Sequence, residues 1–264
     1  RFNVAIGTNT LYTQTTAELN TAVGQGALQA NTANNGVAVG GYALNSNTSG
    51  ARNTGIGNQS LENNTTAADN TAVGNYALYT NTTGHSNVAI GSYAADNNTT
   101  GIKNVAVGYH TLGVNTTGGE NTAVGYQAGE DNAANHLAAF GFRALANNTS
   151  GDVNTAIGHQ SLENCTTGSN NTGVGQNAGT SSSPSGNIVA ASNIVCLGNN
   201  NVSDLFCADT SISSSDSRDK TDVTDFTKGL DWIKALRPVT YRWDRRTWYG
   251  TDAEPFGTPD GSKK

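Results

Sequence analysis

A short pattern of alternating β-branched and small residues, closed by a glycine, recurs along most of the chain. Eight of the ten intervals between these glycines are 17 residues and two are 16. A fixed period of this length is typical of solenoids, in which each repeat forms one stacked rung. The sequence therefore predicts an all-β fold, a parallel β-roll of about eleven 17-residue rungs. The closing glycines are Gly7, Gly24, Gly40, Gly57, Gly74, Gly91, Gly108, Gly125, Gly141, Gly158 and Gly175.

The positions before each glycine predict a strand. The residue before it is Val or Ile in every rung except one, which has Phe140, and the residue two before is always Ala or Gly. Alternation places the β-branched and the small residues on opposite faces. Because a face of only Ala and Gly lets another layer approach closely, we expect several chains to pack these small faces together. Eight rungs carry Leu four residues after the glycine, which predicts a second short strand in each rung.

Two columns of asparagine accompany the strands. Nine of eleven rungs have Asn four residues before the glycine, and a second Asn column lies seven residues after it. Stacked asparagines hydrogen-bond to their own turn and to their copies above and below. Cys165 takes the Asn place in one rung, which predicts a buried, inert thiol. The N-x-T triplets, such as those at Asn64, Asn81 and Asn115, match glycosylation acceptors, but turn chemistry explains them better.

The apolar content of a rung is small. Each rung supplies about three sizeable apolar side chains, whereas ordering its backbone costs about 17–30 kcal/mol. A lone roll of this kind is marginal, so we expect an obligate oligomer. Eleven rungs at about 4.8 Å each make a rod of roughly 50 Å.

Composition narrows the function classes. The 264 residues are 35% apolar and 7% aromatic, with a net charge of −6, too poor in large apolar side chains for one conventional enzyme core. The acidic balance argues against nucleic acid as a partner. No run of about 18 apolar residues predicts a membrane span, no signal peptide opens the chain, and the absence of Met suggests an excerpt of a longer polypeptide.

Charge defines the domain organisation. Residues 1–214 hold four Lys/Arg and residues 215–264 hold ten, together with all three tryptophans. We predict a repetitive shaft at 1–179, a linker and terminal β segment at 180–214, and a small α+β domain beginning at 215. Within the linker, Asn193–Gly198 repeats the strand pattern once more, and Ser203–Thr210 reads as a further strand.

The shaft offers little catalytic or metal-binding chemistry. Cys165, Cys196 and Cys207 fit no metal spacing and are expected to be free thiols. The four histidines share no column, so neither a metal nor a cofactor is expected. An aromatic column two residues after the glycine reads as a solvated face, with sugar binding as the alternative. It comprises Tyr42, Tyr76 and Tyr93, with His110 and Arg143.

The N-[ST]-x-A-[IV]-G strand of residues 1–179 resembles the head repeat of trimeric autotransporter adhesins. The resemblance implies a parallel β-roll built as a homotrimer. The 17-residue period is longer than the usual repeat of that family.

The charged segment contains S-D-x-R-x-K, with Ser215, Asp216, Arg218 and Lys220, followed by L-R-P-V-x-Y-x-W. It resembles the C-terminal intramolecular chaperone of phage tail spikes and fibres, the endosialidase-type self-cleaving peptidases. The resemblance implies that the segment trimerises the fibre and then cuts itself off. Ser215 is then the nucleophile and Lys220 the general base, with Ser215–Asp216 the scissile bond. Residues 216–264 are shorter than the domain of that family and correspond to its front portion.

Chemistry leaves the attacked carbonyl open. A serine needs a base, and nearby cations such as Arg218 lower the pKa of a lysine. Attack by Ser215 on its own carbonyl requires a strained four-membered ring, whereas the preceding carbonyl or a neighbouring chain is easier to reach.

The two resemblances together predict a phage tail fibre or spike in the virion, with other tail proteins and a host receptor or glycan as partners. The alternatives are a bacterial adhesin head, which would lack the chaperone motif, and a polysaccharide-degrading spike. Such a spike needs paired carboxylates, and Glu62, Glu130 and Glu163 lie far apart along the stack.

Overall fold

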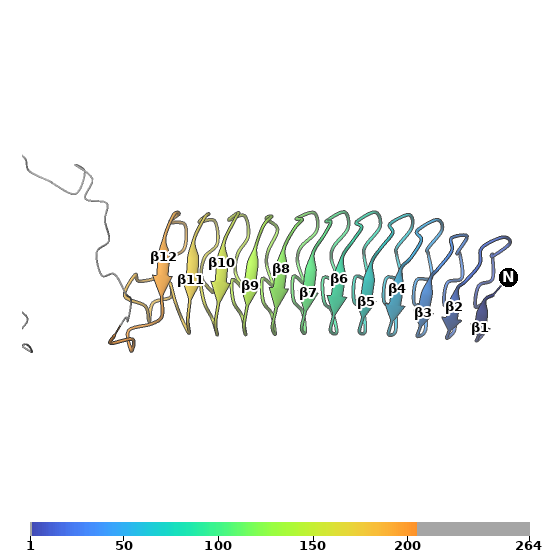
Figure 1. Cartoon of the computed structure of the whole chain (residues 1–264), viewed down its shortest axis with the longest axis horizontal. Coiled ribbons are helices and arrows are strands. Elements are labelled where there is room, and N and C mark those ends of the chain that lie inside the picture. The colour runs from blue at the N-terminus through green and yellow to red at the C-terminus, as the bar shows by residue number, and fades with distance from the viewer. Residues whose placement is uncertain (1, 205–264) are drawn as a thin grey trace, which may run out of the picture. The chain divides into compact units, whose positions relative to one another are not determined.

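The computed structural model describes residues 2–204, which form one parallel β-roll. Its strands lie side by side in chain order along the rod, each paired in parallel with the next (Figure 1). The all-β solenoid with a period near 17 residues is thus confirmed, and the described residues contain no helix. Consequently, none of their segments could cross a membrane as a helix. The strands are β1 (Val4–Ile6), β2 (Thr21–Val23), β3 (Val37–Val39), β4 (Thr54–Ile56), β5 (Thr71–Val73), β6 (Val88–Ile90), β7 (Val105–Val107), β8 (Thr122–Val124), β9 (Ala138–Phe140), β10 (Thr155–Ile157), β11 (Thr172–Val174) and β12 (Val195–Leu197).

The expected strand within Asn193–Gly198 is confirmed as β12. It pairs with β11 in the register of the rest of the sheet, with Gly173 opposite Cys196. The prediction of a strand over Ser203–Thr210 extends beyond the described residues. The parallel register is unbroken from β1 to β12, so equivalent positions of every rung form straight columns along the rod.

The prediction of a second strand in each rung is wrong. The residues after each closing glycine form consecutive turns, and the Leu that was assigned to a strand has a left-handed backbone, with φ of 51° at Leu78 and 52° at Leu112. A left-handed residue cannot continue an extended strand. The turns still bond from rung to rung: Leu78 N–H donates to the carbonyl of Ala94 at 3.0 Å. Each rung therefore has one strand layer and one stacked turn layer.

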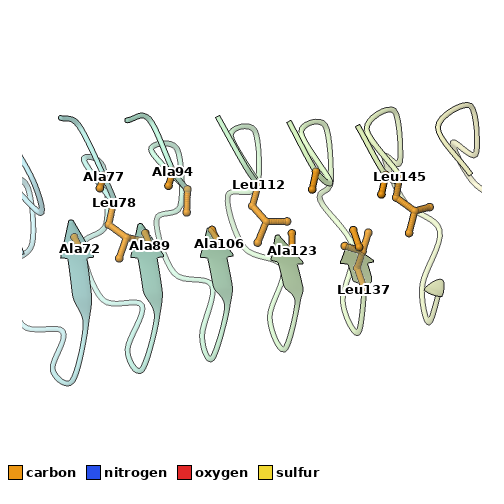
Figure 2. Packing of buried hydrophobic residues seen from close by; sticks show 14 of the residues in the cluster. Ala72, Ala77, Leu78, Ala89, Ala94, Ala106, Leu112, Ala123, Leu137 and Leu145 are labelled. Carbon is orange, nitrogen blue, oxygen red and sulfur yellow. The ribbon is translucent and has the colours of Figure 1, made fainter. Parts of the chain in front are cut away.

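The small residues at the centre of each strand face the interior of the roll. Ala72, Ala89 and Ala106 have no exposed area, and neither do the leucines of the turn layer that they meet (Figure 2). The other layer that approaches the Ala and Gly face is thus the turn layer of the same chain. The expectation that several chains pack these faces together is wrong, because the interior leaves no free Ala/Gly surface.

Three rungs lack the turn-layer Leu, and in two of them another residue fills the space. The Leu column holds Ala95, Gly129 and Gly179 at these three places. A side chain on Gly129 would approach Leu137, and one on Gly179 would approach Ile188. Leu137 and Ile188 are both buried. Ten of the eleven rungs therefore have one large apolar side chain at the centre of the rod, supplied by the Leu column in eight rungs and by Leu137 or Ile188 in two.

Both asparagine columns are buried and hydrogen-bonded, as the sequence predicts. In the column after the glycine, Asn81 Nδ2 donates to Asn64 Oδ1 and to the Gly84 carbonyl, both at 2.9 Å. In the column before the glycine, the side-chain oxygen of Asn70 accepts from the backbone N–H of Asn87 at 2.9 Å. One column thus joins side chain to side chain, and the other joins side chain to backbone.

Cys165 is a defect in the first of these ladders. Its thiol is buried and free, and its Sγ lies 3.4 Å from the Gly168 carbonyl. Burial raises the pKa of this thiol, which keeps it protonated and inert. The Asn148 side-chain oxygen below it accepts only a long 3.5 Å bond, from Asn154.

We expect Cys165→Asn to stabilise the roll by about 1 kcal/mol, the value of one further buried hydrogen bond. The new amide would donate to Asn148 and to the Gly168 carbonyl, as Asn81 does in its own rung. Urea unfolding followed by circular dichroism measures the change, with Cys165→Ala as the control. An Asn variant no more stable than the Ala variant would show that the ladder tolerates this break.

Candidate functional site

The outer face of the sheet carries the β-branched residues. The third residue of six of the twelve strands is between 37% and 46% exposed, as at Val39, Phe140 and Ile157. Alternation along the strand is the physical reason, because the central small residue points inward. The roll thus presents apolar side chains to its surroundings along its whole length.

A ladder of stacked aromatic rings runs beside the strands. Its main part uses the column directly after the closing glycine, where Tyr109, Tyr126 and Phe142 stack at 5.3 and 5.4 Å between ring centroids. Phe142 in turn stacks on His159 at 4.9 Å. Sequence reasoning singled out the neighbouring column, in which Tyr76 stacks on Tyr93 at 5.2 Å. The signal that it missed was the recurrence of aromatic residues at the 17- and 16-residue spacing one position earlier.

The stacking weakens the alternative reading of a sugar-binding column. Sugars bind tyrosine through the face of the ring. In the column that the sequence suggested, Tyr76 and Tyr93 each cover one face of the other, and in the neighbouring column both faces of Tyr126 are covered. The exposed part of Tyr126, 46% of the residue, is therefore its edge and hydroxyl group. Along the middle of the ladder, the rings stabilise adjacent rungs rather than form a stacking platform.

The carboxylates of the shaft do not form catalytic pairs. Glu130 lies 3.1 Å from Nδ1 of His110, and Glu163 binds Arg143 at 2.5 Å. Glu62 and Asp96 each have one buried oxygen without a hydrogen-bond partner among the described residues, and burial raises the pKa of Asp96. Among the described residues, these carboxylates do not form a pair that could act as acid and nucleophile on one glycosidic bond.

Two surface ion pairs lie in the turns that precede the strands β4, β5, β7 and β8. Arg52 binds Asp69 at 2.6 Å, and Lys103 binds Glu120 at 2.8 Å. These hydrogen bonds lower the pKa of both carboxyl groups. Each pair joins equivalent positions of consecutive rungs, which is how the few charges of the shaft align with its repeat.

Other candidate chemistry is absent from the described shaft. Residues 2–204 contain no group of His, Cys, Asp and Glu that could hold a metal ion. Asn64, Asn81 and Asn115 are completely buried, so these N-x-T triplets serve the ladder and are closed to glycosylation. Cys165 and Cys196 are free and buried, as predicted, whereas Cys207 lies outside the described residues.

The predicted catalytic residues also lie outside the described residues. Ser215, Lys220, Asp216 and Arg218 all belong to 205–264, so the structure tests neither their proximity nor their roles.

Comparison with known families supports the C-terminal resemblance. Residues 215–258 match the family described as chaperone of endosialidase. The match begins at Ser215, where the sequence motif begins. Comparisons with curated proteins and with solved structures find no match to this chain. The class is therefore a β-solenoid followed by a segment similar to an endosialidase-type intramolecular chaperone.

Proposed function

We propose that this chain is the shaft of a phage tail fibre or spike, carried in the virion and assembled as a homotrimer. The observation that carries the proposal is the match of residues 215–258 to the endosialidase chaperone, directly after a β-solenoid. A long stack of similar rungs, as in the described residues 2–204, suits a spacer or receptor-binding shaft. Its partners are then other tail proteins and a receptor or glycan on the host surface.

The chaperone segment is proposed to act once, as a self-cleaving peptidase. Lys220 takes the proton of the Ser215 hydroxyl, and the oxygen attacks the carbonyl of a Ser215–Asp216 bond. The Asp216 nitrogen leaves with a proton, and water then hydrolyses the ester and releases the serine. Attack by a serine of one copy on the bond of another avoids the four-membered ring. In this scheme cleavage depends on assembly, because the attacking serine and the scissile bond belong to different copies.

The alternatives have less support. The chaperone match argues against a bacterial adhesin head, because such a head leads into a coiled-coil stalk. A polysaccharide-degrading spike needs two carboxylates placed across one glycosidic bond. In the described shaft, Glu130 and Glu163 are engaged with His110 and Arg143 instead.

We expect Ser215→Ala to abolish processing, because alanine has no nucleophilic oxygen. The full chain would be expressed as wild type and variant and compared on a denaturing gel, with the mass of the shorter product measured. Lys220→Ala should have the same effect, whereas Lys228→Ala, a nearby lysine outside the motif, should still be cut. Shortening of the Ser215→Ala chain at the same bond would refute the nucleophilic role.

A further inference from the structure

The outer face of the sheet is uncharged and periodic, and almost all of its side chains are the β-branched Val, Ile and Thr. It consists of the first and third residues of the strands β1 to β12, which we call the leading and trailing columns. The leading column is Val4, Thr21, Val37, Thr54, Thr71, Val88, Val105, Thr122, Ala138, Thr155, Thr172 and Val195. The trailing column is Ile6, Val23, Val39, Ile56, Val73, Ile90, Val107, Val124, Phe140, Ile157, Val174 and Leu197. The trailing column is entirely apolar, and a contiguous apolar surface of this length is rare on proteins that act as single copies.

The periodicity of this face selects its partner. Side chains recur at the strand spacing of about 4.8 Å over about 50 Å of rod. A partner surface can interlock with this row of side chains along its whole length only if the partner's own side chains have the same spacing. Another copy of this chain has that spacing. The strands are about 10 Å long, which gives roughly 500 Å² of sheet per copy, of the order of the ~800 Å² that each partner contributes to a stable interface. The ion pairs Arg52–Asp69 and Lys103–Glu120 lie in the turns rather than on this face, so no charge has to be desolvated.

A strictly periodic face has one weakness: copies can slip by a rung and still fit. The strand β9 breaks the period. Ala138 is the only alanine of the leading column, and Phe140 is the only aromatic residue of the trailing column. Phe140 is 40% exposed, so the described part of its own chain leaves much of the ring uncovered. The rung therefore carries a protrusion and a depression side by side.

We propose that the outer sheet face binds further copies of this chain, with Phe140 of one copy over Ala138 of the next. In a ring of parallel copies the contacts are head to tail, so the trailing column of one copy meets the leading column of its neighbour. When equivalent rungs of two copies lie at the same height, Phe140, the largest side chain of the trailing column, lies over Ala138, the smallest of the leading column. A slip of one rung would place Phe140 against the bulkier Thr122 or Thr155. The inference rests on the homotrimer of the proposed function and adds its contact face and its axial alignment.

Disulfide formation between copies tests the contact. In the full chain, Thr155→Cys with Ile157→Cys places one thiol in each column of the same rung. Within one copy both side chains stand parallel on the same face of the strand, too far apart to bridge, so a disulfide must join two copies. We expect cross-linked species on a non-reducing denaturing gel, with the chain without these two changes as the blank. Absence of cross-links would overturn the proposed face.

A negative charge introduced at Phe140 should weaken the contact between copies at the neighbouring rungs. Phe140→Asp is combined with Thr155→Cys and Ile157→Cys. The cross-linked fraction should then fall at least about fivefold, as expected for loss of a central aromatic contact. The matched control is Val153→Asp, an exposed valine in the turn column that already contains Asp69. Circular dichroism establishes that both variants are folded. An unchanged cross-linked fraction in folded Phe140→Asp would overturn the inference.

A second pair of thiols tests the alignment. Ile157→Cys with Thr172→Cys joins copies only if they are displaced by one rung. Making the face uniform with Phe140→Val and Ala138→Thr should raise this displaced product and lower the same-rung product. If neither product changes, β9 does not set the alignment. Sedimentation of the unmodified full chain separates the two proposals: a single copy refutes the homotrimer, whereas a trimer insensitive to Phe140→Asp refutes only this face.

Discussion

Gly91→Ala should destabilise the roll by about 3–5 kcal/mol, the sum of backbone strain and overpacking. Gly91 has φ of 136°, a region that residues with a side chain rarely adopt. An added Cβ would lie 2.6 Å from the carbonyl carbon of Gly108 in the next rung, and closer still to its oxygen. Both atoms belong to the backbone, so neither can move without disturbing the stack. Urea unfolding at a fixed protein concentration measures the loss.

The control for this prediction is Gly41→Ser. Gly41 follows a closing glycine, and an added Cβ there would meet only the flexible end of the Asn58 side chain at 3.1 Å. Ser92 occupies the same column in another rung. We expect a change within about 0.5 kcal/mol, as for an ordinary surface substitution. Equal losses for the two variants would mean that the closing glycines have no special conformational role.

Asn81→Leu should cost about 2–5 kcal/mol, although leucine has the same branched arrangement of side-chain heavy atoms as asparagine. Asn81 donates to Asn64 and accepts from Asn98 Nδ2, both at 2.9 Å, and it is completely buried. Leucine would leave the Asn64 oxygen and one Asn98 proton without partners, and each buried unpaired group costs about 1–3 kcal/mol. The Gly84 carbonyl would keep its bond from Asn70.

The same chemical change at Asn75 provides the comparison. Its side chain is only partly buried, and its contacts with Asn58 are long, at 3.4 Å. Asn75→Leu should cost less than about 1 kcal/mol. Thermal or urea unfolding of both variants gives the comparison, and a similar loss at the two positions would contradict a special role for the buried ladder.

Much of the fold could be predicted because the chain repeats itself. The closing glycines located the strands, and the two Asn columns indicated ladders that the structure confirms at Asn64, Asn81 and Asn87. Cys165 is predictable as a member of the ladder because the eight residues before it in the column, from Asn31 to Asn148, are all asparagine.

The orientation of the strands could not be predicted from alternation alone. Alternation places Val and Ala on opposite faces but leaves open which face is inside. In most sheets the larger residue is buried, whereas the interior of this roll is so thin that only Ala72 and its equivalents fit beneath Leu78. The left-handed backbone of Leu78 was equally hidden, because leucine rarely adopts it and no glycine indicates the turn. The predicted site at Ser215 and Lys220 lies outside the described residues, so its outcome depends on the cleavage experiment.

The direction of the hydrogen bonds has a mechanical consequence. The strands lie side by side along the rod, so the bonds that join the rungs run along its axis (Figure 1). A pull on the two ends of the described roll would load these bonds in tension. A terminal rung is bonded to a neighbour on one side only, so it would peel away before an inner rung does. Each released 17-residue rung would lengthen the tether by about 50 Å. Stretching a single copy in an optical trap should thus give a regular series of small, nearly equal steps instead of one large rupture.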